Sequence, residues 1–342
     1  MTGGAGILGT GTYLPEQLLT NEQLAKRFSV TPDWIFERTG IRQRHIAAPE
    51  QACSDLAVLS ARQALENAAT MPDELGLIIV ATATGDVIAP ATAALVQQAL
   101  GSSRAACFDL SAACTGFVYA LVTGCHLISS GLFDKILVIG AEVMSRLVDP
   151  DDLNTAILFG DGAGAAVLGM VPDGCGLLAT DMGTDGSMFA AAYIPGGGSR
   201  VRHTQKTLRD GLQYIRVDGH AVFGFGMRVM GDSLLRLLAR AGLMVKDIDL
   251  FIPHQANQRI VQAAADRLDL PMEKIIQNIE LCGNTSAASI PIALHEALEG
   301  GRINQGSLVA MVGFGGGLGW GSCLLRWHTL QEEPYFNKGG VR

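Results

Sequence analysis

The sequence predicts a layered α/β fold in which one unit is used twice. Two short, continuous apolar runs, 77–81 and 136–140, have the length and composition of strands that are buried on both faces. Helical patterns alternate with such runs, as in 54–69, where Ser54 is placed to cap the helix N-terminus. Strands that alternate with helices favour sheets covered by helices, which is the layered α/β class.

An internal repeat supports the duplication. Three pairs of segments match in the same order and at a nearly constant offset: 64–80 with 237–253, 111–116 with 282–287, and 135–140 with 307–312. Chance similarity between αβ units is the alternative explanation. A true repeat would be a duplicated unit that folds twice, with the two copies packed face to face.

The join between the copies is expected at the Pro-Asp-Gly turn, 172–174. This divides the chain into an N-terminal half, 1–173, and a C-terminal half, 174–342. If the halves pack face to face, the turns 111–116 and 282–287 converge on one central site, because each lies between a strand and an apolar helical segment.

Composition excludes several classes of protein. Apolar residues make up 48% of the 342 residues and charged residues 17%, against a typical charged share of about 25%, so a large core is expected. The net charge of −8 argues against a general nucleic-acid binder. Seven Cys without C-x-x-C spacing predict free thiols in a reducing, cytoplasmic setting and neither a disulfide scaffold nor a metal site.

One segment has the length of a membrane span. Residues 110–133 contain no Asp, Glu, Lys or Arg, and about 20 apolar residues suffice to cross a bilayer. The segment lacks a basic flank and includes polar residues and three Gly, so a helix buried inside the protein is the preferred interpretation. The N-terminus has no basic region followed by a long apolar run, so no signal peptide is expected.

Cys114 is the strongest candidate for a nucleophile. It lies in Ser-Ala-Ala-Cys-Thr-Gly, among small residues between a predicted strand and a predicted buried helix. A thiolate at a helix N-terminus is stabilised by the peptide dipoles and free N–H groups, and small neighbours leave room for a substrate. The alternative is a buried structural cysteine.

His254 and Asn284 are the candidate polar partners of this thiol. His254 directly follows the apolar run 250–253, at the carboxyl end of a predicted strand, where ligand sites of α/β sheets gather. His126 and His295, in apolar helical stretches, are instead expected in the core. The glycine-rich run 313–321 follows another strand, and its backbone N–H groups could approach a ligand closely, as an oxyanion hole requires.

Together these motifs resemble β-ketoacyl-acyl-carrier-protein synthase III, of the thiolase-like superfamily. The resemblance rests on Cys114 in Ser-Ala-Ala-Cys-Thr-Gly, His254 in Pro-His-Gln-Ala-Asn and Asn284 in Gly-Asn-Thr-Ser-Ala, and it extends from about Gly6 to Trp327. It implies a thiolase-like duplicated αβαβα five-layered fold, in agreement with the internal repeat.

The resemblance also implies an activity: decarboxylative Claisen condensation that initiates fatty-acid or related chain synthesis. Cys114 would take an acyl group from acyl-CoA, and a malonyl-acyl-carrier protein would then lose CO₂. His254 and Asn284 would stabilise the resulting enolate, and the N–H groups of Cys114 and Gly316 would hold the tetrahedral oxyanion. The family implies a homodimer, with coenzyme A as a thioester substrate and no permanently bound cofactor.

Five further residues match positions that the family uses to bind coenzyme A. Trp34 and Arg38 would lie around the adenine and phosphates, since an exposed Trp beside Arg suits stacking and phosphate pairing. Phe223, Asn257 and Arg259 would lie along the pantetheine tunnel and its mouth. For Trp34, a helix residue packed on the core is the alternative.

The resemblance places the acyl pocket at Ala89, Met144, Phe159 and Phe314. Ala89 stands where the housekeeping bacterial enzyme has a Phe that reaches across the dimer and closes the partner's pocket. Donors of medium length, or branched ones, are therefore expected to acylate Cys114 at least as well as acetyl does. The segment 190–195 could still cap this space.

Three other positions depart from the family pattern by losing a cation: Leu153, Gly224 and Asp266 stand in place of Arg, Lys and Lys. Fewer cations weaken binding of an anionic carrier or a CoA phosphate. They favour, as the alternative function, a specialised acyltransferase of secondary metabolism that primes polyketides, joins acyl groups or forms esters. A non-catalytic acyl-thioester-binding protein is a further alternative, against which the intact Cys, His and Asn argue.

Overall fold

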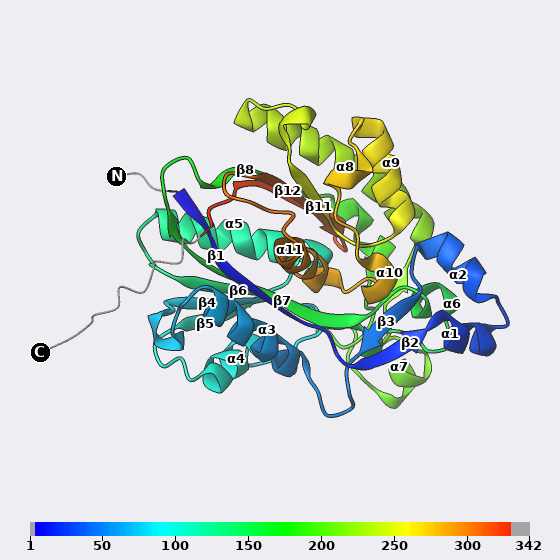
Figure 1. The fold of residues 1–342 in the computed structure, drawn as a ribbon. Coiled ribbons are helices and arrows are strands. Elements are labelled where there is room, and N and C mark those ends of the chain that lie inside the picture. Colours follow the sequence, from blue (N-terminus) through cyan, green and yellow to red (C-terminus); the bar gives the residue numbers. More distant parts are fainter. Residues whose placement is uncertain (1–3, 330–342) are drawn as a thin grey trace, which may run out of the picture.

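A computed structural model describes residues 4–329, in which strands and helices alternate from end to end (Figure 1). The strands are β1 Gly4–Tyr13, β2 Gln17–Thr20, β3 Gln43–Ile46, β4 Leu77–Ala81, β5 Ala106–Leu110, β6 Ile136–Val143, β7 Asp161–Val171, β8 Gly176–Thr184, β9 Ala192–Tyr193, β10 Arg216–Val217, β11 Leu250–Pro253, β12 Leu308–Gly315 and β13 Gly319–Arg326. The helices are α1 Asn21–Phe28, α2 Pro32–Thr39, α3 Cys53–Asn67, α4 Thr92–Leu100, α5 Gly116–Ser129, α6 Leu153–Ala156, α7 Gln205–Arg209, α8 Gly219–Ala241, α9 Gln258–Leu268, α10 Ile279–Cys282 and α11 Ser289–Glu299.

Two mixed sheets form the frame. The first has the order β1-β7-β6-β4-β5, in which β4 is parallel to β5 and β6 while β7 is antiparallel to its neighbours. The second has the order β11-β12-β13-β8, with β11 parallel to β12. The apolar runs that predicted strands are β4 and the first part of β6, and every residue of both strands is buried, as expected for strands covered on both faces.

The elements stack in five layers, which follow one another from the bottom to the top of Figure 1. Helices α3 and α4 cover the outer face of the first sheet, and α8 and α9 cover the outer face of the second. Between the sheets lie α5 and α11, packed in one apolar cluster with strands of both sheets. This is an αβαβα arrangement, with α5 from the first half of the chain and α11 from the second.

The structure repeats at the offset seen in the sequence. Two short 3₁₀ turns precede the central helices, η2 (Ala113–Thr115) before α5 and η7 (Ser286–Ala288) before α11. The distance along the chain from the start of η2 to the start of η7 equals that from the start of β4 to the start of β11. A parallel bridge between Phe251 and Ile275 stands where the second sheet would hold the counterpart of β5. The duplication is therefore structural, and chance similarity is excluded.

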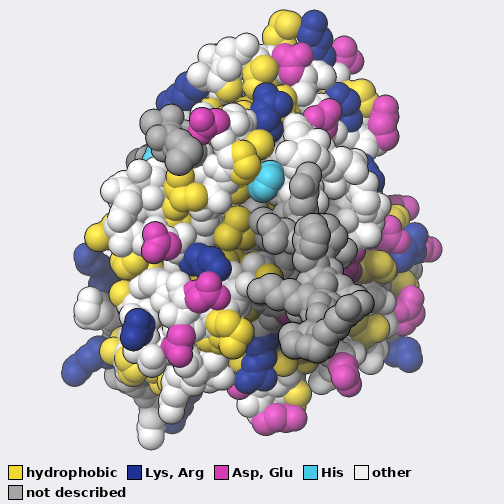
Figure 2. All heavy atoms as spheres, turned by 60° about the vertical axis from the view of Figure 1, so that its left-hand side comes forward, with side chains coloured by type: hydrophobic (Ala, Val, Ile, Leu, Met, Phe, Trp, Pro, Cys, Tyr) yellow, Lys and Arg dark blue, Asp and Glu magenta, His cyan; other side chains and the backbone are white. Residues whose placement is uncertain are grey.

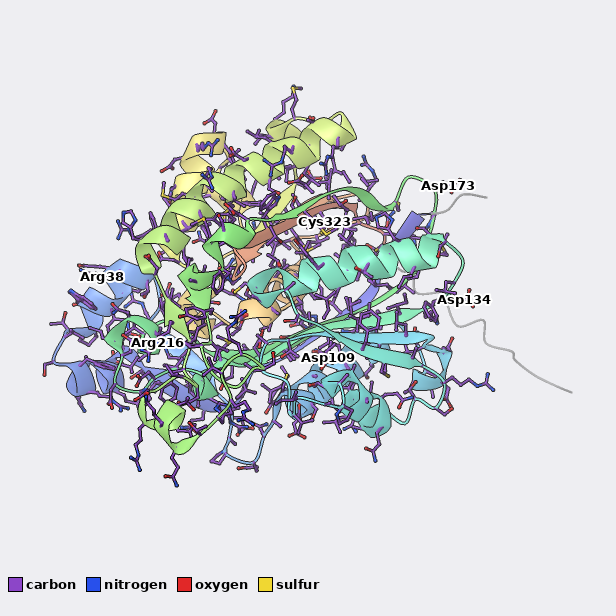
Figure 3. The ribbon with its side chains drawn as sticks, turned by 180° about the vertical axis from the view of Figure 1, so that it is seen from behind. Arg38, Asp109, Asp134, Asp173, Arg216 and Cys323 are labelled. Carbon is purple, nitrogen blue, oxygen red and sulfur yellow. The ribbon has the colours of Figure 1, made fainter. Side chains whose placement is uncertain are left out.

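The connection between the two sheets is short. β7 ends at Val171, a turn is closed by the N–H of Cys175 on the carbonyl of Pro172 (3.0 Å), and β8 begins at Gly176. Asp173 lies on this turn, at the opposite end of the molecule from Arg38 of α2 (Figure 3). All strands of the first sheet precede this turn and all strands of the second follow it.

The uncharged segment 110–133 forms the end of β5, η2 and the 14-residue helix α5, whose inner residues are buried between the sheets. No helix in residues 4–329 has the length and apolar character that crossing a membrane requires.

Two details of the sequence interpretation were wrong. His126 is exposed, because the last turn of α5 emerges at the surface, whereas His295 is buried and contacts Thr10. Ser54 is not the N-cap of α3, which begins after Ala52.

Charges of both signs alternate with hydrophobic side chains over the face shown in Figure 2. Lysine and arginine do not dominate this face, which agrees with the net charge of −8.

Candidate active site

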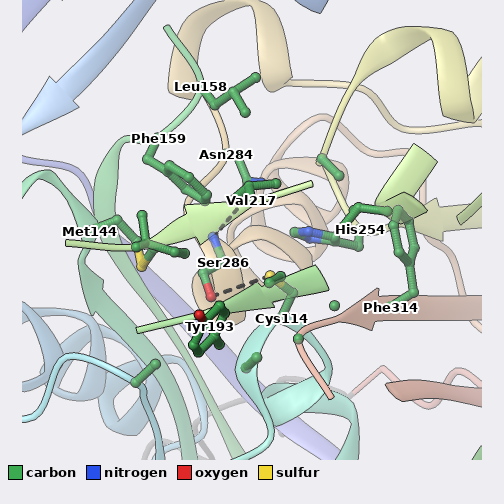
Figure 4. Close-up of a pocket in the computed structure, with 18 of the residues that line it drawn as sticks. Cys114, Met144, Leu158, Phe159, Tyr193, Val217, His254, Asn284, Ser286 and Phe314 are labelled. Carbon is green, nitrogen blue, oxygen red and sulfur yellow. Dashed lines mark hydrogen bonds between the residues drawn. The ribbon is translucent and has the colours of Figure 1, made fainter. Parts of the chain in front are cut away.

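The two 3₁₀ turns meet at a cavity of about 370 Å³ whose lining comes from both halves of the chain. Each turn carries a non-glycine residue in the left-handed region, Ala113 at φ 45° and Ser286 at φ 49°, a conformation that most side chains avoid. The same strained turn thus recurs in each copy, next to the cavity. Cys114, His254 and Asn284 all line this cavity (Figure 4).

Cys114 lies in η2, between the end of β5 and the start of α5. Its Sγ contacts the hydroxyl of Ser286 at 3.4 Å, which joins the two turns (Figure 4). Burial raises the pKa of the Cys114 thiol to about 12, although one side of the residue borders the cavity. The resting residue is therefore a thiol. The predicted thiolate is therefore not the resting form, and desolvation of the charge is the largest influence on this pKa.

His254 follows β11 directly and is almost completely buried. Its Nδ1 lies 2.6 Å from the hydroxyl of Ser289, the first residue of α11. The ring packs edge to face on Phe314, with 5.5 Å between centroids. Burial lowers the pKa of His254 to about 3, so the imidazole is neutral. With Ser289 on Nδ1, Nε2 is the nitrogen that remains for the cavity.

Asn284 is held by its own backbone and side chain. Its N–H donates to the carbonyl of Leu158, and its carbonyl accepts from the N–H of Gly160, which ties it to the chain around Phe159. The side-chain Oδ1 accepts a hydrogen bond from the N–H of Ser286 at 2.9 Å. This leaves the amide NH₂ as the group that can donate into the cavity.

Glycines allow the end of β12 to approach Cys114. A Cβ built on Gly315 would lie 2.8 Å from the Cβ of Cys114 and 3.1 Å from its Sγ, closer than real Cβ contacts allow. A Cβ on Gly316 would lie 3.0 Å from the carbonyl oxygen of Ala192. At Gly315 and Gly316 the glycine-rich run therefore places only backbone next to the Cys114 thiol. Both glycines line the cavity.

The residues predicted to bind coenzyme A lie on α2, on α8 and at the start of α9. Asn257 caps α9, and its Nδ2 donates to the carbonyl of Arg38. The Arg38 guanidinium lies 4.3 Å from the Trp34 ring centre, and that of Arg259 lies 5.6 Å from the Phe223 ring centre. Phe223 and Asn257 line the cavity, whereas Trp34 is half-buried and Arg38 exposed on α2.

Three of the four predicted acyl-pocket residues line the cavity, namely Met144, Phe159 and Phe314. Ala192, Tyr193 and Ile194 line it too, within the segment considered as a cap. Ala89 does not border the cavity of its own chain and is exposed. A role for Ala89 therefore requires a second copy.

Comparison with known proteins gives the family. The family model of 3-oxoacyl-[acyl-carrier-protein (ACP)] synthase III matches residues 108–186, and the model of the C-terminal part of the same family matches residues 238–327. A β-ketoacyl-[acyl-carrier-protein] synthase III of Symbiobacterium thermophilum is 49% identical over 322 residues, which cover 94% of this chain and 98% of the relative. The chain belongs to the β-ketoacyl-[acyl-carrier-protein] synthase III family.

Solved structures of this synthase III family share the fold. The 3-oxoacyl-[acyl-carrier-protein] synthase III of Aquifex aeolicus has a TM-score of 0.88 and 44% identity, covering 95% of this chain and all of that one. The synthase III of Pseudomonas aeruginosa has the same TM-score and identity, with 96% and 99% covered. The thiolase-like, duplicated αβαβα fold predicted from the sequence is confirmed, and the chain is a condensing enzyme of the acyltransferase class.

Sequence reasoning missed three polar residues behind the site of this synthase III. Ser286 contacts Cys114 and Ser289 contacts His254, as described above. Glu142, on β6, accepts a hydrogen bond from the Ser286 hydroxyl at 3.0 Å and is completely buried. A signal for Glu142 existed, because it is the one charged residue in the apolar strand Ile136–Val143.

Proposed function

We propose that this chain joins an acyl group from acyl-CoA to a malonyl-acyl-carrier protein by decarboxylative Claisen condensation and so initiates fatty-acid synthesis. The observation that carries the proposal is the meeting of Cys114, His254 and Asn284 in one cavity, brought from both halves of a synthase III chain. No comparison favours the alternative of a specialised acyltransferase of secondary metabolism.

In the first half-reaction, Cys114 is the nucleophile. Its Sγ attacks the thioester carbon of acyl-CoA, the tetrahedral oxyanion forms, and CoA leaves to give an acyl-Cys114 thioester. The N–H groups of Cys114 and Gly316 are proposed as the oxyanion hole. Support comes from the close approach of β12 to η2, which only glycine at 315 permits.

In the second half-reaction, His254 and Asn284 act on the malonyl group. Neutral Nε2–H of His254 and the amide NH₂ of Asn284 donate hydrogen bonds to the thioester oxygen as CO₂ leaves, so the enolate is stabilised where its charge develops. A neutral imidazole suits this role, because burial holds the pKa of His254 at about 3. The carbanion then attacks the acyl-Cys114 carbon.

Coenzyme A enters as part of a substrate, and no resident cofactor is needed for this chemistry. We place its adenine and phosphates at Trp34 and Arg38, and its pantetheine arm along Phe223, Asn257 and Arg259. The stacking of each arginine on a ring and the hydrogen bond from Asn257 to Arg38 support this path. Met144, Phe159 and Phe314 would line the acyl group.

We further propose a homodimer. β5 is the edge strand of the first sheet, and its Ala106 and Phe108 are exposed. The neighbouring loop exposes Ile88 at 94% and Val87 at 52%. An exposed apolar edge strand is normally covered, and a second copy of this chain would also bring Ala89 to another active site. We also propose that the chain consists of two halves, 1–173 and 174–342. We propose a cytoplasmic location as well, which the seven free cysteines support.

The test is acylation of Cys114→Ala, followed by mass spectrometry of the intact protein after incubation with a panel of acyl-CoAs. We expect no added acyl mass, because no other side chain of that turn forms a thioester, whereas decarboxylation of a malonyl thioester should partly survive through His254 and Asn284. Cys175→Ala, a half-buried cysteine on the connection between the sheets, is the matched control and should acylate normally. Acylation of the Cys114→Ala protein would overturn the assignment.

A further inference from the structure

A chain of three side chains leads from the thiol into the protein. Cys114 Sγ donates to the Ser286 hydroxyl at 3.4 Å, and the Ser286 hydroxyl donates to Oε1 of Glu142 at 3.0 Å. Ser286 and Glu142 are both buried. The serine sits in the turn of one half and the carboxylate on β6 of the other, so this contact exists only because the two copies are packed together.

Glu142 is an unusual group for a core position. Its carboxylate accepts hydrogen bonds from the hydroxyls of Thr84 (2.6 Å) and Thr82 (3.3 Å) and from the N–H of Ala83 (3.2 Å), besides Ser286. Among residues 4–329 no cation forms an ion pair with it. Buried charges are normally paired, and one that has only neutral donors takes up a proton more readily.

The thiol needs a proton acceptor. Burial keeps Cys114 protonated, yet the thiolate is the nucleophile. His254 is a weak base because burial lowers its pKa, and its Nδ1 is engaged by Ser289. The contact that the structure gives the sulfur leads instead to Ser286, whose own proton already points at Glu142.

We propose that Ser286 and Glu142 form the proton path of Cys114, in which the thiol proton passes to the Ser286 oxygen while the Ser286 proton passes to the Glu142 carboxylate. This rests on the proposed role of Cys114 as nucleophile. Ser286 touches the reacting sulfur, and Glu142 acts on it only through Ser286.

The proton balance closes over both half-reactions. In acylation, the Sγ electron pair forms the bond to the thioester carbon, the bond from that carbon to the CoA sulfur breaks, and the CoA thiolate leaves to take a proton from water. Glu142 then holds the thiol proton while the acyl group is on Cys114. In condensation, the carbanion bonds to the acyl carbon, the bond to Sγ breaks, and the released thiolate recovers its proton from Glu142 through Ser286.

The surroundings of Glu142 suit an acceptor that works near neutral pH. Burial raises the pKa of Glu142 to about 7. The titratable groups that face it are the thiols of Cys114 on η2 and Cys53 on α3, and burial raises the pKa of Cys53 as well. Both thiols are neutral around pH 7, so the carboxylate is the group in this cluster that changes charge there.

The experiment measures the rate of Cys114 acylation by acetyl-CoA, with rapid quenching and intact-protein mass spectrometry, from about pH 5.5 to about pH 9.5. For the unmodified protein the rate should rise with pH and level off above about 7, where Glu142 is ionised. In Glu142→Gln the rate at pH 7 should fall on the order of 10²–10⁴-fold. The acylation rate of this variant should also keep rising with pH up to about 9.5, because the Cys114 thiol then has to ionise directly.

Two further variants sharpen the comparison. Ser286→Ala keeps the Glu142 carboxylate but breaks the proton path, so its pH profile should match that of Glu142→Gln. If Glu142→Gln fails to fold, Ser286→Ala decides the question. Asp161→Asn is the matched control. Asp161 is another fully buried carboxylate, held by Ala47 and Ser145 and not in contact with Cys114, so its profile should still level off near pH 7.

Alkylation of Cys114 by iodoacetamide, read by mass spectrometry, repeats the measurement without coenzyme A and should show the same change of profile. If Cys114 is the residue that becomes acylated and both path variants keep a profile that levels off near pH 7, the proton path is wrong, even where the rate is lower throughout. If the acyl group is found on another residue, the proposed nucleophile is wrong instead.

Discussion

His254 illustrates how the interior of this protein sets the protonation state of a single side chain. An exposed imidazole is partly charged at neutral pH, but His254 is almost completely buried and has a pKa of about 3. A charged imidazole would give up its proton to the enolate, whereas a neutral Nε2–H can only donate a hydrogen bond. Burial therefore suits His254 for stabilising an oxyanion, with Ser289 on the opposite nitrogen.

Removing either enolate donor should slow condensation more than acylation. We expect His254→Ala and Asn284→Ala each to lower the rate of condensation and of malonyl decarboxylation on the order of 10²–10³-fold, since each deletes one oxyanion donor. Acylation of Cys114 by acyl-CoA should change far less. Product formation and acyl-enzyme mass are the two measurements, and an equal loss in both would instead indicate a role in activating the thiol.

At the scale of elements, the active site depends on how closely β12 can approach η2. A Cβ on Gly315 would meet Cys114 at 2.8 Å, so the strand lies against the nucleophile only because this residue has no side chain. The same holds at the second turn, η7, where a Cβ on Gly140 of β6 would lie 2.3 Å from the carbonyl oxygen of Ala287. Glycines thus let the two halves close on each other around the cavity.

The Gly315→Ala variant should move Cys114 or the end of β12 and lower the acylation rate on the order of 10²-fold, the loss that a shift of about 1 Å can cause. Gly224→Ala is the control, because a Cβ there meets nothing within 4 Å and the residue lies inside helix α8. It should acylate normally and be more stable by about 0.5–1 kcal/mol. Normal acylation of Gly315→Ala, checked by mass spectrometry, would show that the close approach has no role in positioning the thiol.

At the scale of the whole molecule, the proposed homodimer would bring a second chain to the acyl pocket. Met144, Phe159 and Tyr193 line the cavity, while Ala89 lies on an exposed loop beside the exposed edge strand β5. In the proposed homodimer, Ala89 of each chain would face the other chain's pocket. The small side chain then leaves space for the acyl group, and each buried CH₂ contributes about 0.8 kcal/mol.

Two extra methylenes would therefore favour the longer donor by roughly tenfold, and donors of medium length or branched donors should acylate Cys114 at least as well as acetyl-CoA. Ala89→Phe should shift the preference back toward acetyl. Competition between acyl-CoAs, read as the mass added to Cys114, measures both. A mixed dimer tests whether the effect crosses the dimer. One chain carries both Ala89→Phe and Cys114→Ala, and the other chain is unmodified. The altered preference should then appear on the unmodified chain, which keeps Cys114 and Ala89. A strict preference for acetyl that Ala89→Phe leaves unchanged would remove this position from donor selection.

The sequence alone determined the layered fold and its duplication, and it singled out the three candidate residues that the structure brings to one cavity. Buried strands and their spacing are local patterns. The strand 77–81 and the nearly constant offset between the two copies could therefore be recognised in the sequence. His254 stood out because it follows a strand, where ligand sites of α/β sheets gather. Cys114 stood out because it precedes a helix, and Asn284 because of its Gly-Asn-Thr-Ser-Ala motif. Their individual roles stay predictions until the variants are measured.

The tertiary structure decided what surrounds these residues. Ser286, Ser289 and Glu142 join the site through contacts between positions 172, 35 and 144 residues apart in the chain. The neutrality of His254 and the protonated state of Cys114 also follow from burial between two sheets. Burial and long-range hydrogen bonds depend on how the two halves close together, and a pattern read along one segment contains no information on that closure.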